Sequence, residues 1–294
     1  MRLPRLSKRL ECVARLAGTG EVIADIGCDH GLMPIKLVGE GRFRKAILSD
    51  IREGPLKRAS ANIRLYSAGL KTVTAAGTAG AADPAGTDAL FDLRLGGGLE
   101  TLEPGEADVV TVSGLSGLTV AEIIGGSPEV AGSVSRFVLQ PNTLHRELRV
   151  FLWENGFEIV SEVLVEEHGK FYPVMECRPD VSVKNRSRAD SIFAISTRGT
   201  SGESACEASA ARAGEISAIR AEFGDFIPGQ FSEINKRYLT ARLNEALSVK
   251  KAIESGAEAA SCGDRLKYLE EITDGIGKIL AFYNESEGNS HDSQ

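Results

Sequence analysis

Two carboxylates, each at the end of an apolar run, are the residues of this chain best suited to chemistry. Asp25 follows EVIA and precedes the glycine turn IGCDHG, and Asp50 ends KAILSD. A carboxylate at a strand end can accept hydrogen bonds from both hydroxyls of a ribose. Glycines next to it let the backbone approach a ligand closely. Asp50 could equally cap a helix that starts at Glu53, so the residues alone leave ligand binding and capping open.

Two later apolar runs end in polar turns that could face the same ligand. One leads into SGLSG at residues 113–117, and the other ends in Gln140, Pro141 and Asn142. Side-chain amides can hydrogen-bond both a donor and an acceptor on a base edge, which suits nucleobase recognition. An ordinary turn in the first case and an N-cap at Asn142 in the second are the alternatives.

Other chemistries find little support in the sequence. No Ser-His-Asp set or P-loop is present, and the first turn is not the spaced GxGxxG of a dinucleotide-dependent oxidoreductase. The five cysteines are scattered without a CxxC pair, and the four histidines have no ligand spacing. We therefore expect no metal site, and reduced thiols in a cytoplasmic protein. Asp29 and His30 form the one ionisable pair at the first glycine turn.

The elements that must position these residues alternate between strand and helix patterns up to about residue 180. Short β-branched runs predict strands at residues 21–29, 45–51, 107–114 and 136–142. Apolar spacing from Leu144 to Leu152 predicts a helix that stops at Gly156. Residues 157–167 and 170–178 predict an antiparallel pair at a sheet edge. Near-continuous apolar strands alternating with helices indicate a mostly parallel α/β sheet covered on both faces.

The domain organisation follows from changes in composition and period. We predict a domain at 1–180, a linker at 181–212, a helical hairpin at 213–284 and a disordered tail at 285–294. Small, turn-rich residues at 75–89 predict an inserted loop. Two apolar stripes with helical spacing support the hairpin. They are Leu239, Leu243, Ala246, Leu247 and Ile253, then Leu266, Leu269, Ile272, Ile276 and Ile279.

Composition bounds the partners. The net charge of −7 argues weakly against a polyanionic partner, because binding depends on a local basic patch. The apolar runs are too short to cross a bilayer, and the N-terminus does not resemble a signal peptide, so we expect no membrane partner. Five basic residues gather in the first fifteen positions and predict either a solvated helix face or a binding patch. They are Arg2, Arg5, Lys8, Arg9 and Arg15.

Several motifs in this order resemble those of the bacterial tRNA (adenine(22)-N1)-methyltransferase family. The likeness covers roughly the first 180 residues, and the joint run is specific although each motif alone is not. The family also carries a C-terminal helical, coiled-coil-like appendage. The matching segments are LSKRL (6–10), ADIGCDH (24–30), Pro34, EGPL (53–56), Asn62, RLGGGL (94–99), LQPN (139–142), Leu148-Arg149, ENGF (154–157) and GKFY (169–172).

The resemblance implies a Rossmann-like class I methyltransferase that binds S-adenosylmethionine and acts on tRNA. On the matching positions, Asp25, Gly27 and Asp29 would border the methionine part of the cofactor, and Asp50 its ribose. Gly98 and Leu99 would lie near its adenine. The remaining residues expected at the cofactor are Cys28, His30, Ile51, Ser113 and Gly114. We expect a monomer or a weak homodimer formed through the C-terminal helices.

The resemblance also implies a reaction and a substrate surface. Neutral adenine already has a lone pair on N1, so the enzyme must chiefly position the base and match the cation that forms. Asp29 is the catalytic candidate, accepting from the adenine amino group or stabilising the developing charge, and Asn142 would hold the base edge. The base should be flipped out of its stack, because N1 lies on its pairing edge. The residues expected to bind the tRNA are Arg5, Lys8, Arg9, Gln140 and Pro141.

Two departures from the family pattern keep other functions open. The family usually reads GDGL where this chain has glycine at Gly97, and AGMGG where this chain has a side chain at Ser116. A diverged module that binds tRNA or cofactor without turnover is therefore the main alternative. A methyltransferase with another substrate is the second.

Overall fold

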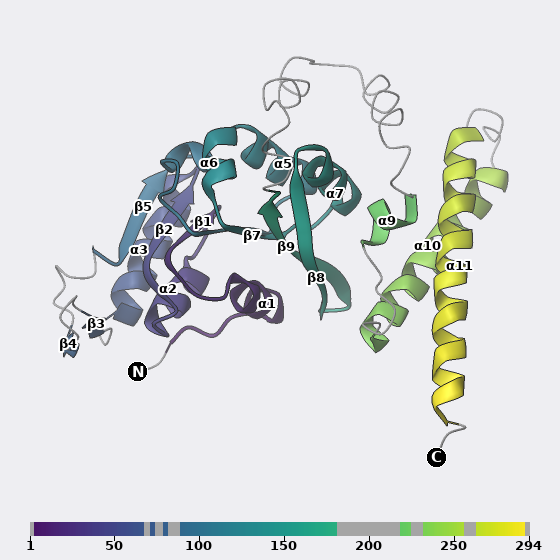
Figure 1. Ribbon diagram of the computed structural model, residues 1–294, viewed down its shortest axis with the longest axis horizontal. Helices are drawn as coiled ribbons and strands as arrows, with labels where there is room; N and C mark the ends of the chain where they lie inside the picture. Colours follow the sequence, from purple (N-terminus) through teal and green to yellow (C-terminus); the bar gives the residue numbers. More distant parts are fainter. Residues whose placement is uncertain are drawn as a thin grey trace. The chain divides into compact units, whose positions relative to one another are not determined.

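The computed structural model describes residues 3–67, 71–73, 79–81, 89–180, 218–224, 232–255 and 263–291. The chain divides into two compact units, Met1–Arg198 and Gly199–Gln294. The boundary falls inside the predicted linker, residues 181–212, which lies outside the described residues. The two units are labelled by element in Figure 1.

A seven-stranded sheet forms the centre of the first unit, in the order β5-β2-β1-β6-β7-β9-β8. The first five of these strands run parallel, and β9 pairs antiparallel with both β7 and β8. The predicted strands, the antiparallel pair at the edge and the mostly parallel α/β sheet are confirmed. The strands are β1 (Gly20–Ile26), β2 (Phe43–Asp50), β5 (Phe91–Leu95), β6 (Val109–Ser113), β7 (Arg136–Gln140), β8 (Phe157–Glu167) and β9 (Lys170–Pro179).

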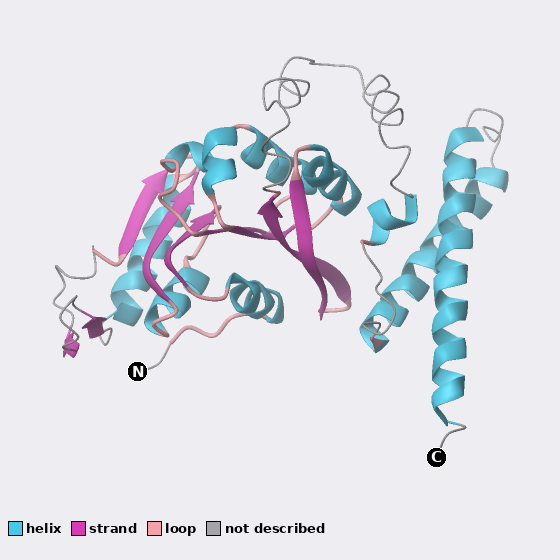
Figure 2. Cartoon of the chain, viewed as in Figure 1, coloured by secondary structure: helices cyan, strands magenta, loops and turns pink. Residues whose placement is uncertain are grey.

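Helices cover both faces of this sheet (Figure 2). Successive strand residues point to opposite faces, so Ile23 packs in one core and Ala24 in the other. Both faces are buried, which explains the near-continuous apolar strands. Three helices form the core that contains Ile23: α1 (Lys8–Ala17), α2 (Leu32–Gly39) and α3 (Glu53–Ser67). Three others form the core that contains Ala24: α5 (Gly117–Gly125), α6 (Pro128–Ser133) and α7 (His145–Glu154).

Strand β5 was not among the strands predicted from the sequence. Its sequence FDLRL carries two charges, so it lacks the apolar run of a central strand. The charges are tolerated because β5 lies at the edge of the sheet. There Lys45 Nζ on β2 contacts Asp92 Oδ2 at 3.2 Å, and Arg94 contacts the same oxygen at 2.8 Å.

The segment between α3 and β5 departs in part from the predicted loop at 75–89. Residues Ala79–Ala81 form β4, which pairs antiparallel with β3 (Lys71–Val73). Small residues lack the apolar alternation that announces a strand, so the hairpin could not be read from the sequence. The rest of the predicted loop up to residue 88 lies outside the described residues.

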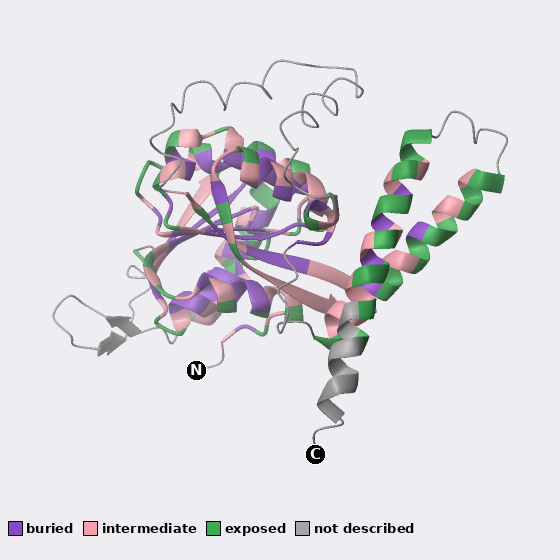
Figure 3. Cartoon of the chain, turned by 45° about the vertical axis from the view of Figure 1, so that its right-hand side comes forward, coloured by how far each residue is buried: buried purple, intermediate pink, exposed green. Residues whose placement is uncertain are grey.

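The second unit consists of α9 (Ala218–Phe223), α10 (Glu233–Ser255) and α11 (Gly263–His291) within the described part of the chain. The two long helices lie side by side (Figure 3), and Leu239 on α10 and Ile276 on α11 are fully buried. Leu247 was predicted in the apolar stripe but is exposed. The short helix α9 was not predicted, and it packs on α11 where Gly275 leaves room for the Ile219 side chain.

Helix α11 also corrects the prediction of a disordered tail at 285–294. It continues to His291, beyond the last residue of the predicted hairpin. A helix satisfies its backbone hydrogen bonds internally, so it can continue through polar residues that show no apolar stripe.

Candidate functional site

The carboxyl ends of the five parallel strands line one edge of the sheet, and the strand order reverses between β1 and β6. In open α/β sheets, ligands bind at this position. Both turns next to the reversal contain glycine in the left-handed region, Gly27 at φ +74° and Gly114 at φ +82°. A Cβ at Gly114 would meet no heavy atom within 4 Å, and one at Gly27 would meet only Leu115 Cδ1, at 3.8 Å. Open space therefore faces both turns.

Asp25 is buried at the end of β1 and is only 5% exposed. Thr111 Oγ1 on β6 donates to Asp25 Oδ1 at 2.6 Å. Burial raises the pKa of Asp25 to about 7; the Thr111 hydrogen bond opposes this rise, and the charge of Asp50 adds to it. A nearby cation would favour the ionised form, so this carboxylate would gain from a positively charged ligand.

Asp50 ends β2 and is 6% exposed. Its Oδ1 accepts from the Arg52 backbone N–H at 3.0 Å, so it shapes the turn before α3 and is not the residue that precedes the helix. Its Oδ2 accepts no hydrogen bond from the described part of the chain and can accept one from a ligand. The next residue, Ile51, is 71% exposed, which is unusual for isoleucine beside a buried strand. A carboxylate and an exposed apolar surface thus stand side by side.

Besides Gly27, the first glycine turn holds Cys28, Asp29 and His30, and the environments of these three side chains differ. The Cys28 thiol lies in the core, and burial, followed by the charges of Asp25 and Asp50, raises its pKa. Its side chain is therefore an inert thiol, and only its backbone can face a cofactor. His30 is exposed, and its backbone carbonyl accepts from Asn62 Nδ2 on α3 at 2.9 Å.

Asp29, the predicted catalytic residue, is exposed and already paired. Its Oδ1 lies 2.7 Å from Arg58 Nη2 on α3, and its Oδ2 lies 3.3 Å from His30 Nε2. Its backbone has φ +46°, a left-handed conformation that aspartate tolerates better than most residues. A base that bound to this carboxylate would have to share it with Arg58 or displace that side chain.

Asn142 lies at the opposite side of the reversal, after β7. Its Nδ2 donates to the Gly114 carbonyl at 2.7 Å, while its Oδ1 accepts from Arg9 Nη1 at 2.7 Å and from Gln140 Nε2 at 3.2 Å. Gln140 is fully buried and also donates to the Pro141 carbonyl at 2.8 Å. The amide group of Asn142 therefore ties the ends of β6 and β7 to the N-terminal helix.

The three basic residues predicted to bind the substrate separate into two kinds. Arg9 is half-buried, and its guanidinium lies over the Tyr172 ring of β9, 5.0 Å from the ring centroid. Arg5 and Lys8 are exposed and form no ion pair with any residue that the structure describes. Arg9 therefore holds structure together, whereas Arg5 and Lys8 are available to a phosphate backbone.

The loop after β5 contains Gly97 and Gly98, and the two glycines have different surroundings. A Cβ at Gly97 would come within 3.1 Å of Ile51 Cδ1, so the loop passes directly beside that exposed side chain. Gly98 is buried. Leu99 is fully buried in the core, so its side chain does not face the edge of the sheet and only its backbone could serve a cofactor.

Ser116 does not require the backbone freedom of glycine. Its φ is −75°, and its hydroxyl accepts from the Thr119 backbone N–H at 3.1 Å as the N-cap of α5. The difference from the family pattern at this position therefore supplies a helix cap. Ser113 lies at the end of β6 and is the register partner of Gln140 on β7.

Four residues of this region were not assigned a role from the sequence. Arg58 and Asn62 lie one turn apart on α3 and hold the first glycine turn, whereas Tyr172 and Glu100 contact Arg9 and Gly97. The spacing of Arg58 and Asn62 on one helix face was the available signal. No local sequence signal predicted the contacts of Tyr172 with Arg9 and of Glu100 with Gly97.

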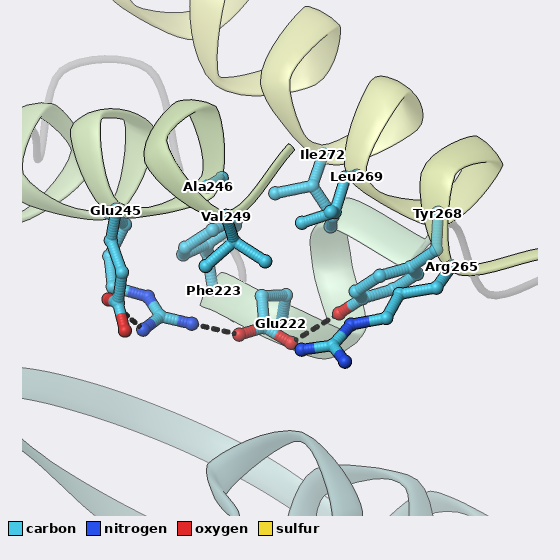
Figure 4. A pocket seen from close by; sticks show the side chains of 10 residues that line it. Glu222, Phe223, Glu245, Ala246, Val249, Arg265, Tyr268, Leu269 and Ile272 are labelled. Carbon is cyan, nitrogen blue, oxygen red and sulfur yellow. Dashed lines mark hydrogen bonds and ion pairs between the residues drawn. The ribbon is translucent and has the colours of Figure 1, made fainter. Parts of the chain in front are cut away.

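The second unit contains a small cavity of about 170 Å³ between α9, α10 and α11 (Figure 4). Glu222 lies at its centre, accepting from Arg242 Nη2 and from the Tyr268 hydroxyl, each at 2.8 Å. Leu269 and Ile272 of α11 lie on its apolar side. These contacts join the three helices, and the cavity therefore serves packing within this unit.

Two further classes of site can be addressed for the described residues. They contain no group of three His, Cys, Asp or Glu side chains that could hold a metal ion. None of their helices is long and apolar enough to cross a membrane. The three cysteines that the structure describes, Cys12, Cys28 and Cys177, are buried and unpaired.

The strand order and the polar residues at the strand ends define a Rossmann-like protein built to bind a nucleoside-containing ligand. Residues 6–175 match the family described as "Methyltransferase domain", and the chain belongs to this family. It is 31% identical over 171 residues to the tRNA (adenine(22)-N(1))-methyltransferase of Bacillus subtilis. That match covers 58% of this chain and 64% of the relative, so less than two thirds of the relative's length is spanned.

Solved structures resemble more of the chain. The crystal structure of the B. subtilis m1A22 tRNA methyltransferase superimposes with a TM-score of 0.70 at 25% identity, covering 94% of this chain and 99% of that one. Streptococcus pneumoniae Sp1610, solved in complex with S-adenosyl-L-methionine, has a TM-score of 0.64 at 24% identity, covering 92% and 100%. The second likeness describes the fold alone.

Proposed function

We propose that this protein transfers a methyl group from S-adenosylmethionine to N1 of an adenine in tRNA, at position 22 as in the B. subtilis relative. The observation that carries the proposal is the edge of the sheet itself. Asp50 and the exposed Ile51 lie at one side of the strand reversal, and Asn142 and Arg9 lie at the other. A nucleoside-type site and an amide-lined surface thus share one edge, as a cofactor and a base require.

The residues present fit the cofactor. The free Oδ2 of Asp50 can accept from ribose hydroxyls, and Ile51 offers an apolar surface to a purine ring. The open turns at Gly27 and Gly114 admit the rest of the molecule, and Asp25 favours a positive charge nearby. When bound, S-adenosylmethionine supplies a methyl group on a sulfonium centre that the N1 lone pair can attack in line.

The chain's own residues would then orient the base. Asp29 would accept from the adenine amino group, with Arg58 moving aside or sharing the carboxylate. Asn142 would hold the base edge by exchanging its bond to the Gly114 carbonyl for one to the base. No strong base is needed, because neutral adenine has a lone pair on N1, so positioning and charge complementarity carry the catalysis.

The tRNA surface would include α1. Lys8 on α1 and Arg5 just before it are exposed and form no ion pair with the described residues, which suits contact with phosphates, while Arg9 links α1 to Asn142. Many cations of the second unit are already paired, as Lys250 is with Glu270 and Lys278 with Asp274. A contribution of that unit would therefore rest on shape more than on charge. A tRNA substrate and reduced thiols agree with a cytoplasmic protein.

The first test is transfer of labelled methyl from S-adenosylmethionine to unmodified bacterial tRNA, followed by nucleoside analysis. We expect 1-methyladenosine, and loss of labelling when adenine 22 of the transcript is replaced by guanine. Folded protein that binds tRNA without labelling it would instead support the non-catalytic module. Labelling that survives the replacement would move the target to another adenine.

A second test addresses Asp29. Asp29→Asn should reduce turnover while S-adenosylhomocysteine, measured by calorimetry, binds with unchanged affinity. Glu21→Gln, at the opposite end of β1, is the matched control and should behave as wild type; among the described residues, the Glu21 carboxylate pairs with Arg44 alone, at 3.2 Å. Full turnover of Asp29→Asn would remove this residue from the mechanism.

A further inference from the structure

The loop that follows β5 folds an acidic side chain back over its own glycines. Glu100 Oε1 accepts from the Gly97 backbone N–H at 2.8 Å. Its Oε2 lies over Gly98, where an added Cβ would come within 2.5 Å of that oxygen. Glu100 is exposed, and Oε2 accepts no hydrogen bond from the described residues. One carboxylate oxygen therefore fixes the loop, while the other remains available.

The position of this loop is held from two sides. Arg94 on β5 donates to Glu106 through both Nη atoms, at 2.7 and 2.5 Å, and to the Thr101 carbonyl at 2.5 Å. The Gly96 N–H donates to the Asp50 carbonyl at 3.0 Å. The carboxylate of Glu100 is thus set relative to Asp50, the residue proposed to hold the ribose.

The same loop offers a hydrogen-bond donor beside this acceptor. Gly98 is buried, yet its N–H donates to no group within the described part of the chain. Buried backbone N–H groups are rarely left without a partner in proteins, so an unpaired one points to a ligand. Ile51, which lies 3.1 Å from a Cβ built at Gly97, provides the apolar surface next to the pair.

A donor and an acceptor side by side match only certain bases. The pairing edge of adenine has an acceptor at N1 next to the amino group at N6, whereas hypoxanthine has a donor at N1 and an oxygen at C6. The Gly98 N–H and Glu100 Oε2 are complementary to the edge of adenine. Hypoxanthine would instead place its N1–H against the Gly98 N–H and its oxygen against the carboxylate. Gly97 has no side chain, so it cannot supply this acceptor.

We propose that Glu100 selects the adenine of the cofactor by accepting a hydrogen bond from its exocyclic amino group, at a site where Gly97 leaves room for it. This inference rests on the proposed function, because it assumes that the nucleoside bound at Asp50 is that of S-adenosylmethionine. Glu100 would then be a specificity-determining residue. Its carboxylate would take the place of the acid that the family pattern has where this chain has Gly97.

The test compares two ligands on the full chain by calorimetry, S-adenosylhomocysteine and its inosine counterpart, S-inosylhomocysteine. Wild type should bind the adenosyl ligand about 10- to 100-fold more tightly, the range expected for one hydrogen bond to a charged group. In Glu100→Gln the ratio should fall to near one. Glutamine keeps an acceptor for the Gly97 N–H, so the loop is retained, while its amide can donate to the inosine carbonyl.

Two further variants sharpen the result. Glu103→Gln changes an exposed acid in the same loop that forms no ion pair with a described residue, and it should keep the wild-type ratio. Gly97→Asp in the Glu100→Gln background should restore preference for the adenosyl ligand.

The outcomes separate this inference from the function on which it rests. Tight binding of S-adenosylhomocysteine with an unchanged ratio in Glu100→Gln would overturn the role of Glu100 and leave the proposed function intact. If the folded wild-type chain bound neither ligand, both the inference and the cofactor of the proposed function would be overturned.

Discussion

The two halves of the sheet edge differ in what their polar groups are doing. At the ends of β1, β2 and β5, Asp50 and Glu100 each use one carboxylate oxygen to hold a turn and leave the other available. At the ends of β6 and β7, the amide of Asn142 is hydrogen-bonded to the Gly114 carbonyl, Gln140 and Arg9. In the first half, acceptors are available to a ligand, whereas in the second the amide of Asn142 is already engaged within the protein.

This difference indicates that the two ligands meet differently prepared surfaces. The cofactor half is preorganised, so binding there costs little rearrangement. The substrate half must exchange existing hydrogen bonds for those of a base, which favours a base already held by other contacts. Cofactor affinity should therefore respond to Asp25, Asp50 and Glu100, and the RNA step to Asp29, Arg9 and Asn142.

The largest effect is expected at Asp50. Asp50→Ala removes the acceptor of the ribose hydroxyls and should weaken binding of S-adenosylhomocysteine about 100-fold, as expected for hydrogen bonds to a charged group. Titration calorimetry measures this, with Glu21→Ala at the far end of β1 as control. Binding within threefold of wild type would show that the ribose lies elsewhere.

A smaller, different effect is expected at Asn142. Asn142→Ala should lower kcat/KM for tRNA about 30-fold, because it removes contacts made to the base, and leave cofactor affinity unchanged. Arg9→Ala should act in the same way, since Arg9 positions Asn142. The double variant should lose little more than either single one. Additive losses would mean that the two residues act separately.

The third effect concerns pH. Because the pKa of Asp25 is raised to about 7, its charge should develop between pH 6 and 8. A cationic ligand should therefore bind about tenfold more tightly at pH 8 than at pH 6, and Asp25→Asn should remove this dependence. Binding of S-adenosylmethionine across this range measures it. A dependence that persisted in Asp25→Asn would belong to another group.

The same raised pKa has a consequence for stability, with a definite sign. The folded state binds the Asp25 proton more tightly than the unfolded chain, so ionisation opposes folding. Stability from this group is present below the unfolded pKa and is lost as pH rises towards 7. Asp25→Asn should therefore be more stable than wild type at pH 8, by about 1–3 kcal/mol. Denaturant unfolding at pH 4 and pH 8 checks the sign.

The smallest effect is expected at Ser116. Ser116→Gly restores the family residue but removes the cap of α5, and should lower the free energy of unfolding by only about 0.3 kcal/mol. Turnover should stay within twofold of wild type. A large gain in activity would mean that the hydroxyl obstructs the substrate half.

Local sequence pattern was sufficient for much of the fold and for part of the site. The apolar runs located β1, β2, β6 and β7, and the residues that end them, Asp25 and Asp50, were recognisable as ligand candidates from that position alone. The reason is that parallel strands bury both faces and bring their carboxyl ends to one edge. Strand β5 and helix α9 were not predicted, because β5 is charged and lies at an edge of the sheet and α9 is short.

Only the tertiary structure decided which side chains are free and which are engaged. Arg9 and Asn142 are 133 positions apart and meet only because α1 packs across the ends of β6 and β7. Asp29 meets Arg58, 29 positions away, because α3 packs against β2 and β5. Strand and helix periodicity describes the face on which a residue lies, whereas hydrogen-bond partners depend on where distant elements are packed. The motifs therefore located the edge of the site, and the packing of α1 and α3 determined how each of its halves is prepared.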